Sequence, residues 1–151
     1  MEIFLQNMIH DASDETPFHI YMIDFNDFKQ VNDKFGHIAG DRALQLVADA
    51  LHNVSDSVHG FCARYGGDEF VLITRDNHEI ALQDLMQKEV NTLRQKCADL
   101  IPRITVCTGY AVCKSGAITA TQLIAQADEQ LYIQKEIYHG RRKPDAGPKS
   151  E

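Results

Sequence analysis

The sequence predicts an α+β fold in which helices flank a central, mostly antiparallel sheet. Three observations predict this class. Segments with helical apolar spacing alternate with short apolar runs of strand length. Two of those runs are joined by a Gly-Gly pair suited to a tight antiparallel hairpin, which argues against a purely parallel sheet. The length of 151 residues is typical of one domain.

The first half of the chain is expected to form a helix, a strand, a short helix and a long helix. Apolar residues at helical spacing favour a helix over residues 1–12. After a polar loop, residues 18–25 form an apolar run that fits a buried central strand. Residues 26–34 indicate a short helix that ends at Gly36, and residues 39–54 carry one apolar stripe typical of an amphipathic helix.

The second half begins with the hairpin. Residues 61–65 and 68–74 are its predicted strands, and Gly66-Gly67 supplies a turn that needs positive φ angles. We assign residues 1–140 to the domain and residues 141–151, rich in charge, Pro and Gly, to a flexible tail. The remaining elements are expected to be a helix over residues 80–100 that Pro102 stops, a strand over residues 104–112 and a helix over residues 119–139.

Composition excludes several classes of function. A net charge of −7 disfavours binding to nucleic acid or anionic membranes, because both need clustered Lys and Arg. No apolar run approaches the roughly 20 residues that a bilayer-spanning helix needs. The four cysteines lack metal-binding spacing, so we interpret them as small core residues of a cytoplasmic protein. They are Cys62, Cys97, Cys107 and Cys113.

Acidic side chains lie at the ends of two predicted strands. Asp24 closes the first strand, and Asp68 and Glu69 follow the glycine pair of the hairpin. Carboxylates and carbonyls without nearby His or Cys favour a hard cation such as Mg²⁺, whose shell is completed by water and phosphate oxygens. The same pattern also fits an ordinary strand end and an exposed turn, because acidic residues are common near turns.

Longer motifs favour the metal interpretation. The hairpin carries Arg64-Tyr65-Gly66-Gly67-Asp68-Glu69-Phe70, which resembles the signature of the GGDEF family, the diguanylate cyclases. Residues 24–37, followed by Gly40-Asp41, resemble the second long motif of that family. The resemblance covers residues 18–142 in order. Its later parts are Ile104-Thr105-Val106 with Gly109, then Ala127-Asp128-Glu129, Leu131-Tyr132 and Lys135.

The resemblance implies a fold, a reaction and partners. Family members resemble the palm of nucleotide polymerases and cyclases, with a central antiparallel sheet wrapped by helices. They condense two GTP into cyclic di-GMP and release pyrophosphate, and two domains, each with one GTP, must face each other. We therefore expect a cytoplasmic bacterial signalling enzyme that acts as a homodimer and follows a sensor domain in the full-length protein. We expect no contact of this segment with nucleic acid or membrane. The alternative is a catalytically weak GTP-binding regulatory or scaffold module.

The resemblance also implies a metal and catalytic site. Asp24 and Asp68, with the backbone carbonyl of Phe25, resemble the ligands of two Mg²⁺ ions, with Mn²⁺ as an alternative. Such ions would neutralise the triphosphate and would explain how an acidic chain holds a polyanion. Glu69 resembles a residue that either helps to deprotonate the attacking 3′-hydroxyl or shares in metal binding.

Asn32 and Asp41 resemble the residues that bind guanine in the family. The chemistry agrees, because a carboxylate accepts hydrogen bonds from the N1–H and amino group of guanine, whereas adenine presents an acceptor at N1. A subgroup that accepts ATP departs from the family at the Asp41 position, and this chain does not. Taken alone, Asp41 could instead be the N-cap of the helix that follows it.

Phosphate contacts are implied for Lys29 and Lys135, and for backbone N–H groups around Phe28 at the start of the short helix. The last arginine of the family follows a glycine at a fixed distance from the helix tyrosine. Here Gly140-Arg141 lies two residues further along than that spacing, so Arg141, Arg142 or neither takes this role.

The chain departs from the family at three further places. The opening Leu-Thr-Gly-Leu-x-Asn-Arg stretch is missing, so we expect a piece of a longer protein or a trimmed first helix. Ser57 and Gly60 occupy the positions of the inhibitory RxxD motif, so no inhibitory product site is expected. The segment between the signature and Ile104 is shorter than usual.

Overall fold

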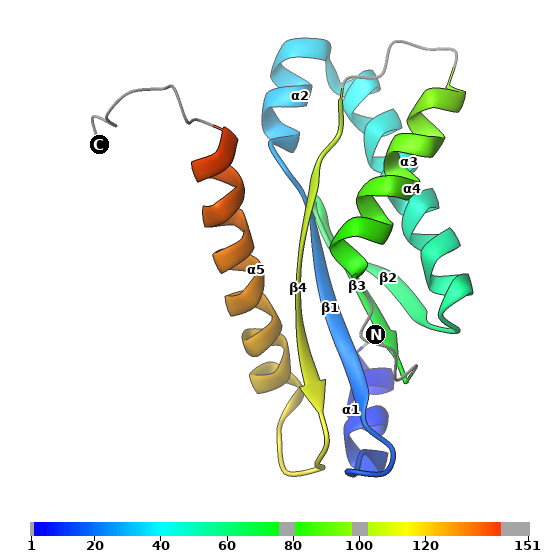
Figure 1. Cartoon of the computed structure of the whole chain (residues 1–151), viewed down its shortest axis with the longest axis vertical. Helices are drawn as coiled ribbons and strands as arrows, with labels where there is room; N and C mark the ends of the chain where they lie inside the picture. The colour runs from blue at the N-terminus through cyan, green and yellow to red at the C-terminus, as the bar shows by residue number, and fades with distance from the viewer. Residues whose placement is uncertain (1, 76–80, 98–102, 143–151) are drawn as a thin grey trace.

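The computed structural model describes residues 2–75, 81–97 and 103–142, and within these ranges it has five helices and one four-stranded sheet (Figure 1). The helices are α1 (Glu2–Asp11), α2 (Phe28–Phe35), α3 (His37–Ser57), α4 (Leu82–Lys96) and α5 (Ala120–Arg142). The strands are β1 (Phe18–Phe25), β2 (Phe61–Gly66), β3 (Glu69–Thr74) and β4 (Val106–Cys113). They lie in the order β2-β3-β1-β4, and every pairing is antiparallel. The predicted α+β class is confirmed.

Strand β1 is the centre of the fold because it pairs with β3 on one side and with β4 on the other. Its side chains alternate between the two faces of the sheet, as they must in a strand. Tyr21, Ile23 and Phe25 lie in a core with residues of α3 and α4, whereas Ile20 and Met22 lie in a core with residues of α1 and α5. We call these two sides the α3 face and the α5 face, and Figure 1 shows helices on both.

Helix α5 approaches β4 very closely at Gly109. A Cβ atom at this position would lie 2.1 Å from the backbone nitrogen of Leu131 and 2.6 Å from the carbonyl oxygen of Ala127. Both distances are far inside van der Waals contact, so the helix backbone can reach the strand here only because residue 109 has no side chain. This contact sets the position of the helix that carries Lys135.

The hairpin turn lies one residue later than predicted. Gly66 is paired with Glu69 at the end of β2, so the turn is Gly67-Asp68 and not Gly66-Gly67. A register irregularity between Arg64 and Gly66 puts an extra residue into β2, which the glycine pattern does not reveal. Gly67 has the positive φ angle, 29°, and Asp68 is a turn residue and not the first residue of β3.

Helix boundaries also differ from the prediction. Helix α3 begins at His37, directly after Gly36, whose φ of 91° separates it from α2. Asp41 therefore lies inside α3, and its interpretation as an N-cap is wrong. The described part of the helix predicted over residues 80–100 is α4, which buries Leu82, Met86 and Val90.

Some expectations about chain ends and composition can be compared with the structure. Residues 143–151 of the predicted tail, and residues 80, 98–100 and 102 around α4, lie outside the described ranges, so the domain division at residue 140 stays a prediction. Cys107 and Cys113 are buried as expected, but Cys97 is exposed at the end of α4. Within the described ranges, no helix combines the length and apolarity needed to cross a bilayer.

Candidate functional site

Acidic side chains converge at one end of β1 and β3. Asp24, near the end of β1, lies directly opposite Glu69, the first residue of β3. The N–H of Phe25 donates to the carbonyl of Asp68 at 3.0 Å, which ties the hairpin turn to the end of β1. Alternation along the two strands places Asp24 and Glu69 on the α5 face. The carboxylates that the sequence singles out are thus neighbours in the fold.

Lys135 of α5 is the cation that faces this acidic cluster. Its Nζ forms an ion pair with Asp24, whose side chain is only 5% exposed. Burial lowers the pKa of Lys135, but the bond to Asp24 and the charge of Asp68 outweigh burial, so the pKa is raised and the amine stays protonated. The resemblance implies that Lys135 contacts a phosphate. In the structure, Lys135 contacts the carboxylate of Asp24.

One lysine does not neutralise the acidic cluster. Burial raises the pKa of Asp24, and the nearby Asp68 adds to this effect although Lys135 opposes it. Burial also raises the pKa of Glu69, with further contributions from Asp24 and Asp128. Raised carboxyl pKa values mean that the fully ionised cluster is electrostatically unfavourable. A divalent cation bound there would relieve the repulsion.

The donor atoms fit a hard divalent cation with an incomplete protein shell. Asp24 and Asp68 offer carboxylate oxygens and Phe25 offers a backbone carbonyl, and all of these are the oxygen donors that such cations prefer. Nowhere in the described ranges do three or more His, Cys, Asp or Glu side chains form a cage for an ion. An ion at this cluster would therefore take its other ligands from water and from a bound substrate, as Mg²⁺ commonly does.

Asn32 and Asp41 are brought together by the contact between α2 and α3. A Cβ atom on Gly40 would lie 1.7 Å from Oδ1 of Asn32, so the glycine makes room for the amide beside Asp41. Among the described residues, Oδ1 of Asn32 is the buried side-chain oxygen that has no hydrogen-bond partner. A buried unpaired acceptor costs about 1–3 kcal/mol. This atom therefore fits a ligand that presents N–H donors.

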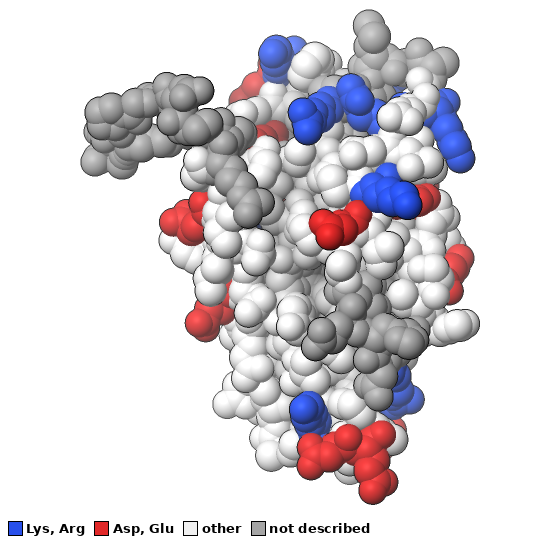
Figure 2. Space-filling view, viewed as in Figure 1, with Lys and Arg blue, Asp and Glu red and all other residues white. Residues whose placement is uncertain are grey.

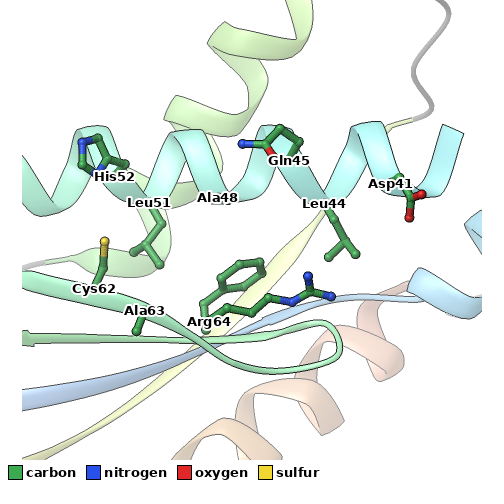
Figure 3. A pocket seen from close by; sticks show the side chains of 10 residues that line it. Asp41, Leu44, Gln45, Ala48, Leu51, His52, Cys62, Ala63 and Arg64 are labelled. Atoms are coloured by element: carbon green, nitrogen blue, oxygen red, sulfur yellow. The ribbon is translucent and has the colours of Figure 1, made fainter. Parts of the chain in front are cut away.

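Asp41 also borders a pocket between α3 and β2, with a volume of about 480 Å³ (Figure 3). Apolar side chains such as Leu44 and Phe70 form most of its wall, and Figure 3 shows Arg64 extending from β2 toward Leu44. The Nε of Arg64 donates to the carbonyl of Gly67 at 2.8 Å, which holds the guanidinium over the hairpin turn. An apolar slot with polar groups at its border suits a flat heteroaromatic base. The lining residues are Asp41, Leu44, Gln45, Ala48, Leu51, His52, Cys62, Ala63, Arg64 and Phe70.

Leu44 and Arg64 are site residues that the sequence patterns did not single out. Leu44 belongs to the apolar stripe of α3, so its position alone indicates a core residue. Arg64 belongs to the hairpin signature, and it pairs with Phe70 across the two strands. The available signal was that Leu44 lies one helical turn after Asp41, on the side of α3 that faces β2.

The predicted phosphate contacts lie at the end of the molecule where α2 is found. Helix α2 begins at Phe28, and the ring of Phe28 packs on that of Phe25 with centroids 5.2 Å apart, so its side chain is structural. Lys29 follows and is exposed. Figure 2 shows Lys and Arg side chains gathered toward this end, although the chain is acidic overall. Arg141 and Arg142 lie in the last turn of α5, where the side chains are outside the described part.

Comparison with known proteins gives concordant matches. The family model for "Diguanylate cyclase, GGDEF domain" matches residues 1–141. Diguanylate cyclase DosC of Escherichia coli (strain K12) is 32% identical over 140 residues, which cover 88% of this chain and 29% of that protein. Cyclic di-GMP phosphodiesterase PdeR of the same strain is 30% identical over 142 residues, which cover 91% of this chain and 21% of that protein. The chain thus spans less than a third of these curated relatives.

A solved structure shows a similar arrangement. The active GGEEF domain of a diguanylate cyclase from Vibrio cholerae superposes with a TM-score of 0.64 at 29% sequence identity. The match covers 82% of this chain and 79% of that one. The antiparallel sheet flanked by helices is therefore the palm fold of the nucleotide cyclases.

Proposed function

Because the chain belongs to the family of diguanylate cyclase GGDEF domains, we propose that it condenses two GTP molecules into cyclic di-GMP and releases two pyrophosphates. In each half-reaction a 3′-hydroxyl attacks the α-phosphate of the other nucleotide. The bond from that phosphorus to the bridging oxygen breaks, and pyrophosphate leaves. Since the chain spans less than a third of its curated relatives, this activity of the whole protein is part of the proposal.

The observation that carries the proposal is that one hairpin borders two adjoining sites. Along β3, Glu69 belongs to the acidic cluster on the α5 face, and the next residue, Phe70, lines the pocket on the α3 face. A nucleoside triphosphate needs both environments, an apolar slot for its base and cations around its phosphates. The hairpin would let a single nucleotide use them together.

The acidic cluster is the proposed metal and catalytic centre. Asp24, Asp68 and the carbonyl of Phe25 would hold Mg²⁺, with Mn²⁺ as an alternative, and the bound metal would supply Lewis-acid neutralisation of the triphosphate charge. Dependence on a divalent metal is what the resemblance to this family implies. Lys135 pairs with Asp24 and opposes the rise in its pKa, and its amine would also contact a phosphate oxygen. Burial raises the pKa of Glu69, which moves this carboxylate toward the range of an effective proton acceptor for the 3′-hydroxyl.

Guanine selection is assigned to Asn32 and Asp41. The carboxylate of Asp41 would accept from N1–H and the amino group of guanine, and the unpaired Oδ1 of Asn32 would accept from a further N–H. Adenine would bring an acceptor against Asp41 and would leave the buried Oδ1 of Asn32 unpaired, which disfavours binding. Leu44 and Arg64 would line the base on either side.

Phosphate binding is assigned to the start of α2 and to nearby cations. Backbone N–H groups at Phe28 and Lys29 open the helix, where the helix dipole favours an anion. The side chains of Lys29 and Lys135 would add charge, and Arg141 stays a further proposed contact. The second domain that the reaction requires would come from another copy of the chain, in a cytoplasmic protein whose upstream sensor domain raises the local concentration.

The proposal is tested with Asp68→Ala. We expect this substitution to lower the rate of cyclic di-GMP formation from GTP and Mg²⁺ by about a hundredfold or more, because it removes a carboxylate from the developing charge. The product is measured by chromatography at several protein concentrations, and the wild-type rate should rise with the square of concentration. Asp14→Ala, which removes an exposed carboxylate in the loop before β1, is the matched control and should keep the wild-type rate. Wild-type turnover in Asp68→Ala would contradict the assignment.

A second candidate is a GTP-binding regulatory module with little turnover. The match to PdeR favours it, because that relative carries the same region and is named as a phosphodiesterase. Calorimetry with GTP and Mg²⁺ separates the two. Tight binding without cyclic di-GMP at any protein concentration would favour the module over the enzyme.

A further inference from the structure

Thr105 is a motif residue that the proposed function leaves without a role. It lies just before β4 and joins two elements that border the acidic cluster. Its hydroxyl accepts a hydrogen bond from Nδ2 of Asn26 at 3.3 Å and donates to Oη of Tyr138 at 3.0 Å. Its carbonyl accepts from the backbone N–H of Asn26 at 2.9 Å. One residue thus links the segment after β1 to helix α5.

The contact with Asn26 fixes the direction of a proposed metal ligand. The carbonyl of Phe25 and the N–H of Asn26 belong to one trans peptide group and therefore point in opposite directions. Since that N–H is bound to Thr105 on the β4 side, the carbonyl of Phe25 points away from β4, toward the side of the hairpin turn. Asn26 is only 5% exposed, and its side-chain amide also donates to Sγ of Cys107 at 3.2 Å. Both the backbone N–H and the side chain of Asn26 are therefore fixed by hydrogen bonds.

The contact with Tyr138 fixes the helix that carries the lysine. Tyr138 lies about one helical turn after Lys135, on the part of α5 that reaches the end of β1. The bond to Thr105 therefore holds this turn of α5 against the start of β4 while Lys135 pairs with Asp24.

We propose that Thr105 is a positioning residue of the nucleotide site. Its hydroxyl couples the side chain of Asn26, whose peptide group presents the Phe25 carbonyl, to the helix that presents Lys135, so the ligand and the cation keep their relative placement. The role assigned to the site rests on the proposed function, but the coupling itself does not.

Gln87, which bonds the backbone on both sides of Thr105, provides a control residue. Gln87 of α4 donates to the carbonyl of Ile104 at 2.8 Å and accepts from the N–H of Val106 at 3.1 Å. The side chain of Gln87 therefore holds the residues on both sides of Thr105. Among the described residues, it has no hydrogen bond to Asn26 or Tyr138. Gln87→Leu therefore loosens the segment and leaves the Asn26–Thr105–Tyr138 link in place.

The experiment compares Thr105→Val, which removes the hydroxyl at nearly constant volume, with Thr105→Ser, which keeps it. Both are made in the wild type and in a Lys135→Met background, and kcat and the KM for GTP are measured. We expect Thr105→Val to lower kcat about tenfold, with little change in KM because the base pocket is on the other face. Thr105→Ser should restore most of kcat, and Thr105→Val should cost much less in the Lys135→Met background. Gln87→Leu should lower the unfolding midpoint and leave kcat unchanged.

Equal losses for Thr105→Val in both backgrounds, or equal impairment of Thr105→Ser and Thr105→Val, would overturn the proposal. Failure of the proposed function is distinguishable, because a wild-type chain without turnover refutes the cyclase assignment alone. The coupling is then read from denaturation midpoints. If Thr105 acts with Lys135, the double variant shifts the midpoint by less than the sum of the single shifts, and an additive result overturns the inference.

Discussion

The α5 face and the α3 face of the sheet differ in the charged groups that they bury. On the α5 face, a buried Asp24 is paired with Lys135, and burial together with neighbouring carboxylates raises the pKa of Glu69. On the α3 face, the pocket is mostly apolar, and its charged lining residues are Asp41 and Arg64 (Figure 3). Under the proposed function, the first face would bind a cation and the second would bind an aromatic base.

This difference follows from the alternation of side chains in a strand. Successive residues of β3 point to opposite faces, so Glu69 and Phe70 serve different environments although they are adjacent in sequence. A one-residue shift of register would exchange the two and destroy both sites. The irregularity between Arg64 and Gly66 is therefore part of the arrangement, because it sets which residues form the turn.

The largest effect is expected from a substitution that displaces α5 from the sheet. Gly109→Val places a side chain where a Cβ would lie 2.1 Å from the backbone of Leu131, so α5 must shift away from β4. We expect the free energy of unfolding to fall by about 3 kcal/mol or more, as for severe overpacking. Chemical denaturation measures it. Gly140→Ala in the same helix has open space around it and should be neutral or slightly stabilising. Similar stability of both variants would mean that α5 does not approach β4 as described.

An intermediate effect is expected from a substitution on the α3 face, which should change the KM for GTP more than kcat. Asp41→Asn removes an acceptor for the guanine edge without touching the acidic cluster. We expect the KM for GTP to rise about 10- to 100-fold, with kcat changed much less, since the lost interaction concerns base binding. Asp49→Asn, two turns later on α3 and outside the pocket lining, is the control and should keep the wild-type KM. An unchanged KM in Asp41→Asn would place guanine elsewhere.

The smallest expected effect concerns pH and the α5 face. Because the pKa of Glu69 is raised above its ordinary value of 4.5 in the folded state, its contribution to stability is present at low pH and is lost as the pH rises through the raised value. Glu69→Gln should therefore gain stability relative to the wild type between pH 4 and pH 7, by at most about 1 kcal/mol because the side chain is partly solvated. Denaturation at both pH values, in the presence of a chelator, measures the change. A relative loss of stability over this range would reverse the assigned sign.

Much of the fold, but less of the site, could be predicted from the sequence. The strand over residues 18–25 was predicted with its observed bounds, because an apolar run of that length leaves few alternatives. The turn was misplaced because glycine spacing does not show an extra residue in β2. The Lys135–Asp24 ion pair and the Thr105–Tyr138 hydrogen bond join residues far apart in the chain, so only the packing of α5 on the sheet shows them.

The most direct test of the account is a crystal structure with a non-hydrolysable GTP analogue and Mg²⁺. The account predicts a metal ion about 2.0–2.1 Å from carboxylate oxygens of Asp24 and Asp68. It also predicts the guanine edge within hydrogen-bond distance of Asn32 and Asp41. A nucleotide bound away from the β2–β3 hairpin, or a metal that touches neither carboxylate, would contradict it.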